Sequence, residues 1–176
     1  PTYTCERIPE LVTVVELLNS TGMEANLEIK PSKAGFELRN TLIDAVIASL
    51  AKLENTDSIL VSSFDMDLLT SLKARAPQYR RACLFEPTGA PIMEQVEKWI
   101  KQASKLEAVA IHPCERGLTE EAMRAMTEAG FQVNVWTVND LERAAQLGSW
   151  GAHSVITDIA QDFPQESRSA RPISNR

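Results

Sequence analysis

The sequence predicts an α/β fold built on a parallel sheet, and three observations support this fold class. Short apolar runs, each long enough for a strand, begin 22 to 33 residues apart along the chain. Amphipathic stripes with the helical period lie between these runs. Glycines stand where the helices should end. This regular alternation over 176 residues indicates one domain with a substantial core.

The elements follow in order along the chain. Six strands are expected near residues 25–29, 58–62, 80–84, 107–111, 131–135 and 153–157. Four helices are marked by apolar stripes, which are Leu11, Val14, Val15 and Leu18; Leu42, Val46, Ser49, Leu50 and Leu53; Leu68, Leu69, Leu72 and Ala76; and Ile92, Val96, Trp99, Ile100 and Ala103.

Capping residues indicate where several helices begin and end. Thr119 precedes an acidic first turn, and Asn139 with Glu142 three positions later is close to a capping box. Gly22 and Gly130 are placed to end helices before the next strand. Asp65 and Asp67 fall in a predicted first helical turn, where carboxylates complement the helix dipole, so we do not interpret them as a metal pair.

Two parallel architectures fit this alternation. A doubly wound sheet would carry a glycine-rich phosphate loop after its first strand, and the sequence has neither form of that loop. A TIM (β/α)8 barrel keeps its chemistry at the carboxyl ends of many strands. Polar and aromatic residues do follow the predicted strands, namely Glu28 and Lys30, Ser62 and Ser63, His112, Trp136 and Thr137, and Thr157 with Asp158. The barrel is therefore favoured, and this chain would supply about six of its eight βα units, strands three to eight.

Composition excludes several classes of protein. The net charge of −6 and the pI near 5.0 give no basic surface for nucleic acid. No apolar run approaches the ~20 residues of a membrane span, and no signal-peptide pattern is present. The three cysteines are too few and too scattered for a disulfide framework or a zinc cluster. We expect a cytoplasmic protein with a domain over residues 1–163 and a mobile tail over 164–176.

The strand near residues 25–29 carries an unusual row of polar side chains. Asn26, Glu28 and Lys30 share one face, because alternate residues of a strand point to the same side. Three polar groups on one face of a buried strand are costly unless they serve a site. The alternative is that Glu28 and Lys30 form an ion pair at the rim with no ligand.

Several motifs together resemble the glycerophosphodiester phosphodiesterases, especially the bacterial cytoplasmic members. The motifs are NLEIK at 26–30, LVSSFD at 60–65, VNVWTVND at 133–140 and GAHSVITD at 151–158, preceded by RIPELVTVVELL at 7–18. Each motif is short and common, so the specificity lies in their order and spacing.

The resemblance implies a metal-dependent hydrolase that splits glycerophosphodiesters into glycerol 3-phosphate and an alcohol. By position, Glu28 matches a carboxylate ligand of the divalent cation, Mg²⁺ or Ca²⁺. Lys30 matches the basic residue that faces the phosphate, and Trp136 matches an aromatic wall of the pocket. Ser63 and His112 are further candidates for substrate binding, although each could serve the fold alone.

The sequence also departs from the family pattern. It lacks the H-R-G, E-x-D and H-D motifs that carry the acid–base histidines and two further metal carboxylates. His112 and His153 do not match that histidine pair. We therefore expect the acid–base histidines upstream of Pro1 or on another chain, and we expect this chain alone to be inactive. The open barrel edges should favour self-association.

Two other functions stay open. A non-catalytic binding or scaffold module on the same barrel would explain the missing motifs. A Schiff-base aldolase using Lys30 is the rival enzyme, although the adjacent Glu28 carboxylate would stabilise the charged amine and so disfavour it.

Overall fold

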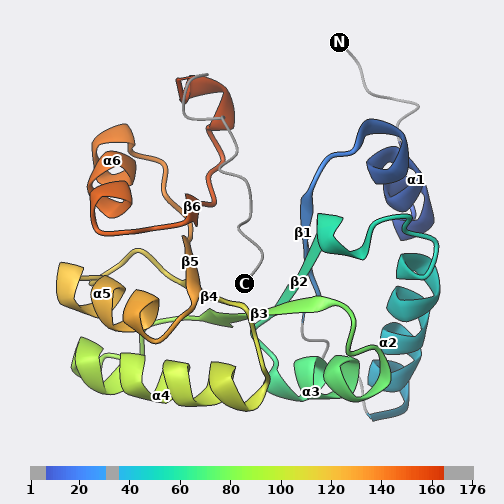
Figure 1. Cartoon of the computed structure of the whole chain (residues 1–176), viewed down its shortest axis with the longest axis horizontal. Coiled ribbons are helices and arrows are strands. Elements are labelled where there is room, and N and C mark those ends of the chain that lie inside the picture. The colour runs from blue at the N-terminus through green and yellow to red at the C-terminus, as the bar shows by residue number, and fades with distance from the viewer. Residues whose placement is uncertain (1–6, 31–35, 165–176) are drawn as a thin grey trace.

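Six parallel strands form one curled sheet in the computed structural model, which describes residues 7–30 and 36–164 (Figure 1). Their spatial order follows the chain, β1-β2-β3-β4-β5-β6, and each strand pairs in parallel with the next. The strands are β1 Ala25–Glu28, β2 Ile59–Ser63, β3 Arg80–Phe85, β4 Ala110–Pro113, β5 Gln132–Val135 and β6 Ser154–Val155. The parallel α/β prediction is confirmed.

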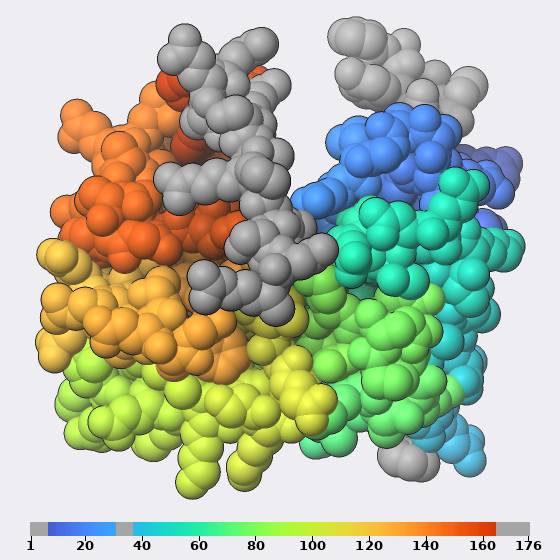
Figure 2. Space-filling view, in the orientation of Figure 1, coloured from blue at the N-terminus to red at the C-terminus, as the bar shows by residue number. Residues whose placement is uncertain are grey.

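The helices lie on the outer, convex side of the sheet (Figure 1). They are α1 Leu11–Thr21, α2 Phe36–Leu50, α3 Met66–Arg75, α4 Ile92–Lys105, α5 Glu120–Glu128 and α6 Leu141–Ser149, with short 3₁₀ turns at Thr56–Ser58 and Ala160–Asp162. In Figure 2 the outer wall runs without a break from α2 and α3 through α4 to α5. The concave side of the sheet carries no helix among the described residues, so the chain forms a half-barrel whose β1 and β6 edges stay unpaired.

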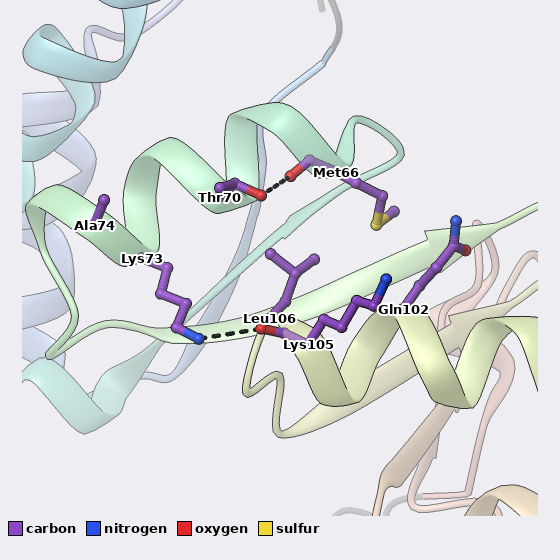
Figure 3. A pocket seen from close by; sticks show the side chains of 7 residues that line it. All are labelled: Met66, Thr70, Lys73, Ala74, Gln102, Lys105 and Leu106. Atoms are coloured by element: carbon purple, nitrogen blue, oxygen red, sulfur yellow. Dashed lines mark hydrogen bonds between the residues drawn. The ribbon is translucent and has the colours of Figure 1, made fainter.

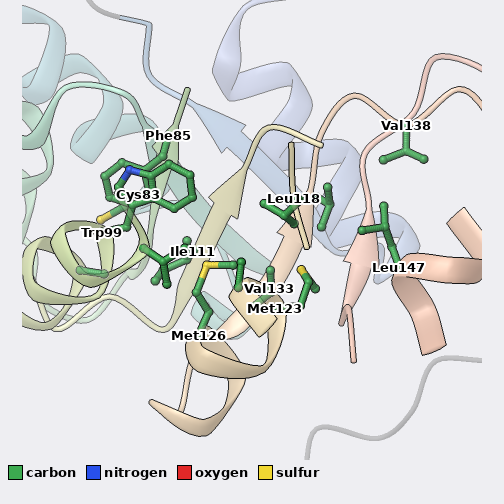
Figure 4. Packing of buried hydrophobic residues seen from close by; sticks show 14 of the residues in the cluster. Cys83, Phe85, Trp99, Ile111, Leu118, Met123, Met126, Val133, Val138 and Leu147 are labelled. Carbon is green, nitrogen blue, oxygen red and sulfur yellow. The ribbon is translucent and has the colours of Figure 1, made fainter. Parts of the chain in front are cut away.

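Two apolar clusters fill the space between sheet and helices. One joins β1 and β2 to α1, α2 and α3, and the other joins the remaining strands to α4, α5 and α6. Figure 4 shows the second cluster, in which Phe85 of β3 stacks on Trp99 of α4 at 5.2 Å between ring centroids. Such a ring pair contributes about 1 kcal/mol beyond the area it buries. Burial in the same cluster raises the pKa of the Cys83 thiol to about 12.

Two strand positions differ from the prediction. The fourth strand begins at Ala110, whereas we expected 107–111, because helix α4 extends to Lys105 and the chain then turns through Glu107 at a φ of 49°. The sixth strand contains only Ser154 and Val155.

Helix capping agrees with the prediction at two sites and differs at one. The Thr119 hydroxyl accepts a hydrogen bond from the Ala122 N–H at 3.2 Å and so caps α5 as expected. Gly22 ends α1 in the left-handed region, with a φ of 67°. The expected Asn139 cap is wrong: Asp140 caps α6, and its carboxylate accepts from the Arg143 N–H at 2.6 Å.

The expected mobile tail, 164–176, lies outside the described residues except for Pro164. In the part of the chain that the structure describes, no helix has the length and apolar character needed to cross a membrane.

Candidate functional site

The concave face of the sheet holds most of the residues that the sequence singled out. Ile111 and Val133 pack in the cluster under the helices, so their neighbours His112 and Asn134 point to the concave side. The register places Leu84 beside His112 and Glu28 beside Ser62. The carboxyl ends of parallel strands meet at one edge, which brings residues distant in sequence together there.

Glu28 and Lys30 lie at the carboxyl end of β1 with both side chains exposed. Neither makes a hydrogen bond or an ion pair with any described residue, so the expected alternative of a rim ion pair between them is wrong. Our premise of a buried strand also fails, because Asn26 and Glu28 are exposed and Ala25 and Leu27 are only half-buried. Neither charge is paired within the described residues.

Ser63 ties the end of β1 to the start of α3. Its hydroxyl donates to the Ile29 carbonyl oxygen at 2.6 Å and accepts from the Asp65 N–H at 3.0 Å. The residue is fully buried, so it holds the strand that carries Glu28 and Lys30 in place.

Asp65 has a structural role, as the sequence predicted, but it lies at the N-cap of α3 and not in the first turn. Its partner is a residue that the sequence did not single out. Its carboxylate caps α3 by accepting from the Asp67 and Leu68 N–H groups. It also pairs with the Arg39 guanidinium from the first turns of α2. Arg39 thus stands at the same edge as Lys30, and only the tertiary fold reveals this.

Trp136 follows β5 and borders the carboxyl end of the sheet. Its indole N–H donates to the His112 carbonyl oxygen at 2.8 Å, and its ring meets the edge of Phe64 at 5.3 Å between centroids. The indole is half-buried, which leaves part of it open to a ligand. Phe64 is a second aromatic residue of this wall, and sequence reasoning missed it because it sits in the short stretch between β2 and α3.

His112 lies within β4 and is 1% exposed, so the expected rim position is wrong. Its Nε2 lies 2.8 Å from the Asn134 side-chain nitrogen. Burial lowers the pKa of His112 to about 4, since the surroundings disfavour a charged ring. The imidazole is therefore neutral at physiological pH.

Asn139, which precedes α6, forms a polar cluster with residues that follow β6. The Asn139 amide donates to the Asp158 carboxylate at 2.9 Å and accepts from the Thr157 hydroxyl at 3.0 Å. Asp158 does not cap the closing 3₁₀ turn, which has Ile159 at its N-cap and no side-chain cap. His153 precedes β6 at the amino end of the strand and is exposed.

The described residues do not form a metal centre on their own. Among residues 7–30 and 36–164, no group of three His, Cys, Asp or Glu side chains lies close enough together to hold a metal ion. Glu28 supplies one carboxylate, and one carboxylate does not match the six or more oxygen ligands of Mg²⁺ or Ca²⁺.

An open groove of about 500 Å³ lies between helices α3 and α4 (Figure 3). The Lys73 ammonium at its margin donates to the Lys105 carbonyl oxygen at 3.1 Å and pairs with Glu107 at 2.8 Å. The lining comes from the outer helices and includes none of the site residues predicted from the sequence.

Comparison with known proteins places this chain in one family. The model of the glycerophosphoryl diester phosphodiesterase family matches residues 2–161. A glycerophosphodiester phosphodiesterase of Caldanaerobacter subterraneus is 27% identical over 87% of this chain and 59% of its own length.

Solved structures agree with this match. A phosphodiesterase of Oleispira antarctica, determined in complex with the product sn-glycerol-3-phosphate, is 27% identical with a TM-score of 0.74, covering 92% of this chain and 60% of that one. A Silicibacter pomeroyi protein, named provisionally as a glycerophosphoryl diester phosphodiesterase, has a TM-score of 0.77 at 22% identity, covering 86% and 54%, which supports the fold. This chain therefore spans about 60% of the curated relative's length, and it belongs to the glycerophosphoryl diester phosphodiesterase family.

Proposed function

We propose that this chain forms the phosphate-binding part of an enzyme that hydrolyses glycerophosphodiesters to glycerol 3-phosphate and an alcohol. The observation that carries the proposal is the pair of exposed, unpaired charges Glu28 and Lys30 at the carboxyl end of β1. It is supported by the family match and by the relative from Oleispira antarctica that binds sn-glycerol-3-phosphate.

Lys30 would neutralise the phosphate. An ammonium on the strand end can approach phosphoryl oxygens without first breaking an ion pair, since the structure gives it none among the described residues. Positive charge placed where negative charge develops stabilises the transition state of phosphoryl transfer. Arg39 on α2 could add to the positive potential of this edge, although Asp65 already pairs with it.

Trp136 and Phe64 would form the apolar wall of the pocket. Their edge-to-face contact places two rings beside the polar strand ends. Ligand sites combine such an apolar wall with a few polar groups that fix orientation. The wall would cover the glycerol moiety or the leaving alcohol.

Glu28 would be one ligand of a divalent cation, Mg²⁺ or Ca²⁺. Because the described residues hold no group of three ligating side chains, no catalytic step can be assigned to a metal within them. The resemblance implies that the other carboxylates belong to the E-x-D motif, which this sequence lacks.

The acid–base group would also come from outside this sequence. Hydrolysis needs a proton for the leaving alkoxide. His112 is buried and neutral, and exposed His153 lies at the opposite end of the sheet from Glu28 and Lys30. We therefore propose that this polypeptide alone is inactive, and that the complete enzyme is cytoplasmic and acts in glycerophospholipid breakdown.

An assay with glycerophosphocholine tests the proposal. The protein encoded by the longest open reading frame should release glycerol 3-phosphate and lose this activity with chelator, with Glu28→Gln, or with Lys30→Met. The 176-residue chain should release none. Hydrolysis by this chain that survives Glu28→Gln would refute the mechanism, and inactivity of the protein from the longest reading frame would favour the non-catalytic module.

The rival aldolase function is disfavoured. Lys30 is exposed, whereas a lysine that forms a Schiff base is activated by burial in an apolar pocket.

A further inference from the structure

A row of three polar side chains crosses β4, β5 and β6 on the concave face. The Ser154 hydroxyl donates to Asn134 Oδ1 at 2.8 Å, and Asn134 Nδ2 lies 2.8 Å from His112 Nε2. Asn134 and His112 are 6% and 1% exposed, while Ser154 is exposed at the edge strand. The row therefore leads from the surface into the sheet.

This row indicates where the proton of His112 lies. An amide NH₂ group can only donate, so Nε2 of His112 must accept. The ring is neutral because burial lowers its pKa to about 4. A neutral imidazole that accepts at Nε2 carries its proton on Nδ1. In this orientation the amide oxygen accepts from the Ser154 hydroxyl.

The Nδ1–H group has no hydrogen-bond partner among the described residues. Among the described residues, one other buried side-chain polar atom has no hydrogen-bond partner, and it is Ser62 Oγ. Both point to the concave side, on β2 and β4, and the strand between them presents Ala82 and Leu84 there. A buried donor left unpaired is costly, and a functional role is one reason why a native protein retains such a group.

We propose that Asn134 and Ser154 are positioning residues that hold His112 as an Nδ1–H donor for an oxygen of a ligand bound on the concave face. The chemical class of that ligand, a glycerol phosphate, rests on the function proposed above. Nδ1 is closed to solvent in this structure, so binding at this atom requires its neighbours to move. The half-buried Trp136, whose indole N–H bonds to the His112 carbonyl oxygen, links this donor to the aromatic wall.

Nitrogen NMR of histidine-labelled protein tests the proton position without any assay of activity. The chain has two histidines, and exposed His153 serves as an internal reference. At pH 7, His112 should show a protonated Nδ1 and an unprotonated Nε2. A protonated Nε2 would mean that the amide is reversed, and would overturn the proposal.

Variants separate positioning from folding. Asn134→Asp places an acceptor against Nε2 and should move the proton there. The control is Asn26→Asp at an exposed position, which should leave the protonation of both His112 nitrogens unchanged. Ser154→Ala should relax the amide and mix the two tautomers, and Ser154→Thr should restore the single form. Since Ser154 is exposed, these two variants test the row even where Asn134→Asp fails to fold.

Titration with sn-glycerol 3-phosphate tests the ligand. The Nδ1 resonance should shift saturably in the protein of the longest reading frame, and Asn134→Asp should weaken binding about tenfold, as expected for one hydrogen bond to a charged group. Binding that depends on Lys30 but leaves Nδ1 unmoved would overturn this inference and keep the proposed function. Absence of any binding would overturn the ligand assignment and the proposed function together.

Discussion

The ring of Phe64 meets the indole of Trp136 edge-on, at 5.3 Å and 90°, although the two residues follow strands β2 and β5. Two intervening strands separate them in the sheet. The contact therefore spans the concave face at its carboxyl edge, and it exists only because the sheet curls.

This contact should contribute a measurable coupling energy. Trp136→Ala is expected to reduce the free energy of unfolding by about 2 kcal/mol, since the indole is half-buried and hydrogen-bonded. A double-mutant cycle with Phe64→Ala, measured by urea denaturation, should give a coupling of about 1 kcal/mol. The stacked Phe85 and Trp99 pair provides the comparison. A coupling energy indistinguishable from zero would show that the two rings do not stabilise each other.

Buried His112 should make stability depend on pH. Its pKa falls from 6.5 to about 4 on folding, so the unfolded chain binds a proton in this window and the native chain does not. The resulting stability is fully present above pH 6.5 and is lost as pH falls toward 4. Between pH 7 and 4.5 the wild type should lose about 2 kcal/mol more than His112→Gln. The exposed His153→Gln variant should follow the wild type, and equal slopes in all three proteins would contradict the buried neutral ring.

Arg81 should contribute strongly to the free energy of unfolding. No carboxylate of the described residues lies within hydrogen-bonding distance of it. It is 6% exposed, and its guanidinium donates to the carbonyl oxygens of Leu106, Pro77 and Tyr79 at 2.7 to 3.1 Å. Arg81→Ala is expected to cost about 3 kcal/mol, because it leaves several carbonyls without partners. Its neighbour Arg80, which makes one bond to Gln132, should cost about 1 kcal/mol when changed to Ala. Equal losses in thermal unfolding would contradict this role.

Glu28 and Lys30 should matter for the ligand and not for the fold. Both are exposed and unpaired among the described residues, so Glu28→Gln and Lys30→Met should change the free energy of unfolding by less than about 0.5 kcal/mol. The same variants should abolish hydrolysis in the protein of the longest reading frame. Lys98→Met, an exposed change on α4, is the control for charge alone. A large loss of stability at either position would assign the pair to the fold.

The unpaired edges of β1 and β6 should drive association. Each is a terminal strand of the described sheet, and the outer side of such a strand presents backbone donors and acceptors that another chain can pair with. Size-exclusion chromatography with light scattering should show oligomers of this chain that increase with concentration. A monodisperse monomer with a high melting temperature would contradict the prediction.

Much of the fold could be read from local pattern. Apolar runs and helical stripes predict strands and helices because each element must bury one face, and this requirement leaves a periodic trace in the sequence. The ends of a helix follow less directly from the sequence where two capping signals compete. At Asn139 and Asp140 both side chains can cap a helix, and the contact of Asn139 with Asp158, 19 residues later, decided between them.

By itself, the sequence determined the strand–helix alternation, the place of Glu28 and Lys30 at a strand end, and the likeness to one family. These follow from local patterns and from the order of short motifs along the chain. Only the tertiary structure decided that His112 is buried and bonded to Asn134, that Arg39 pairs with Asp65, and that Phe64 meets Trp136. Those contacts join different strands and helices, and their geometry follows from the curl and register of the sheet, which no local pattern specifies.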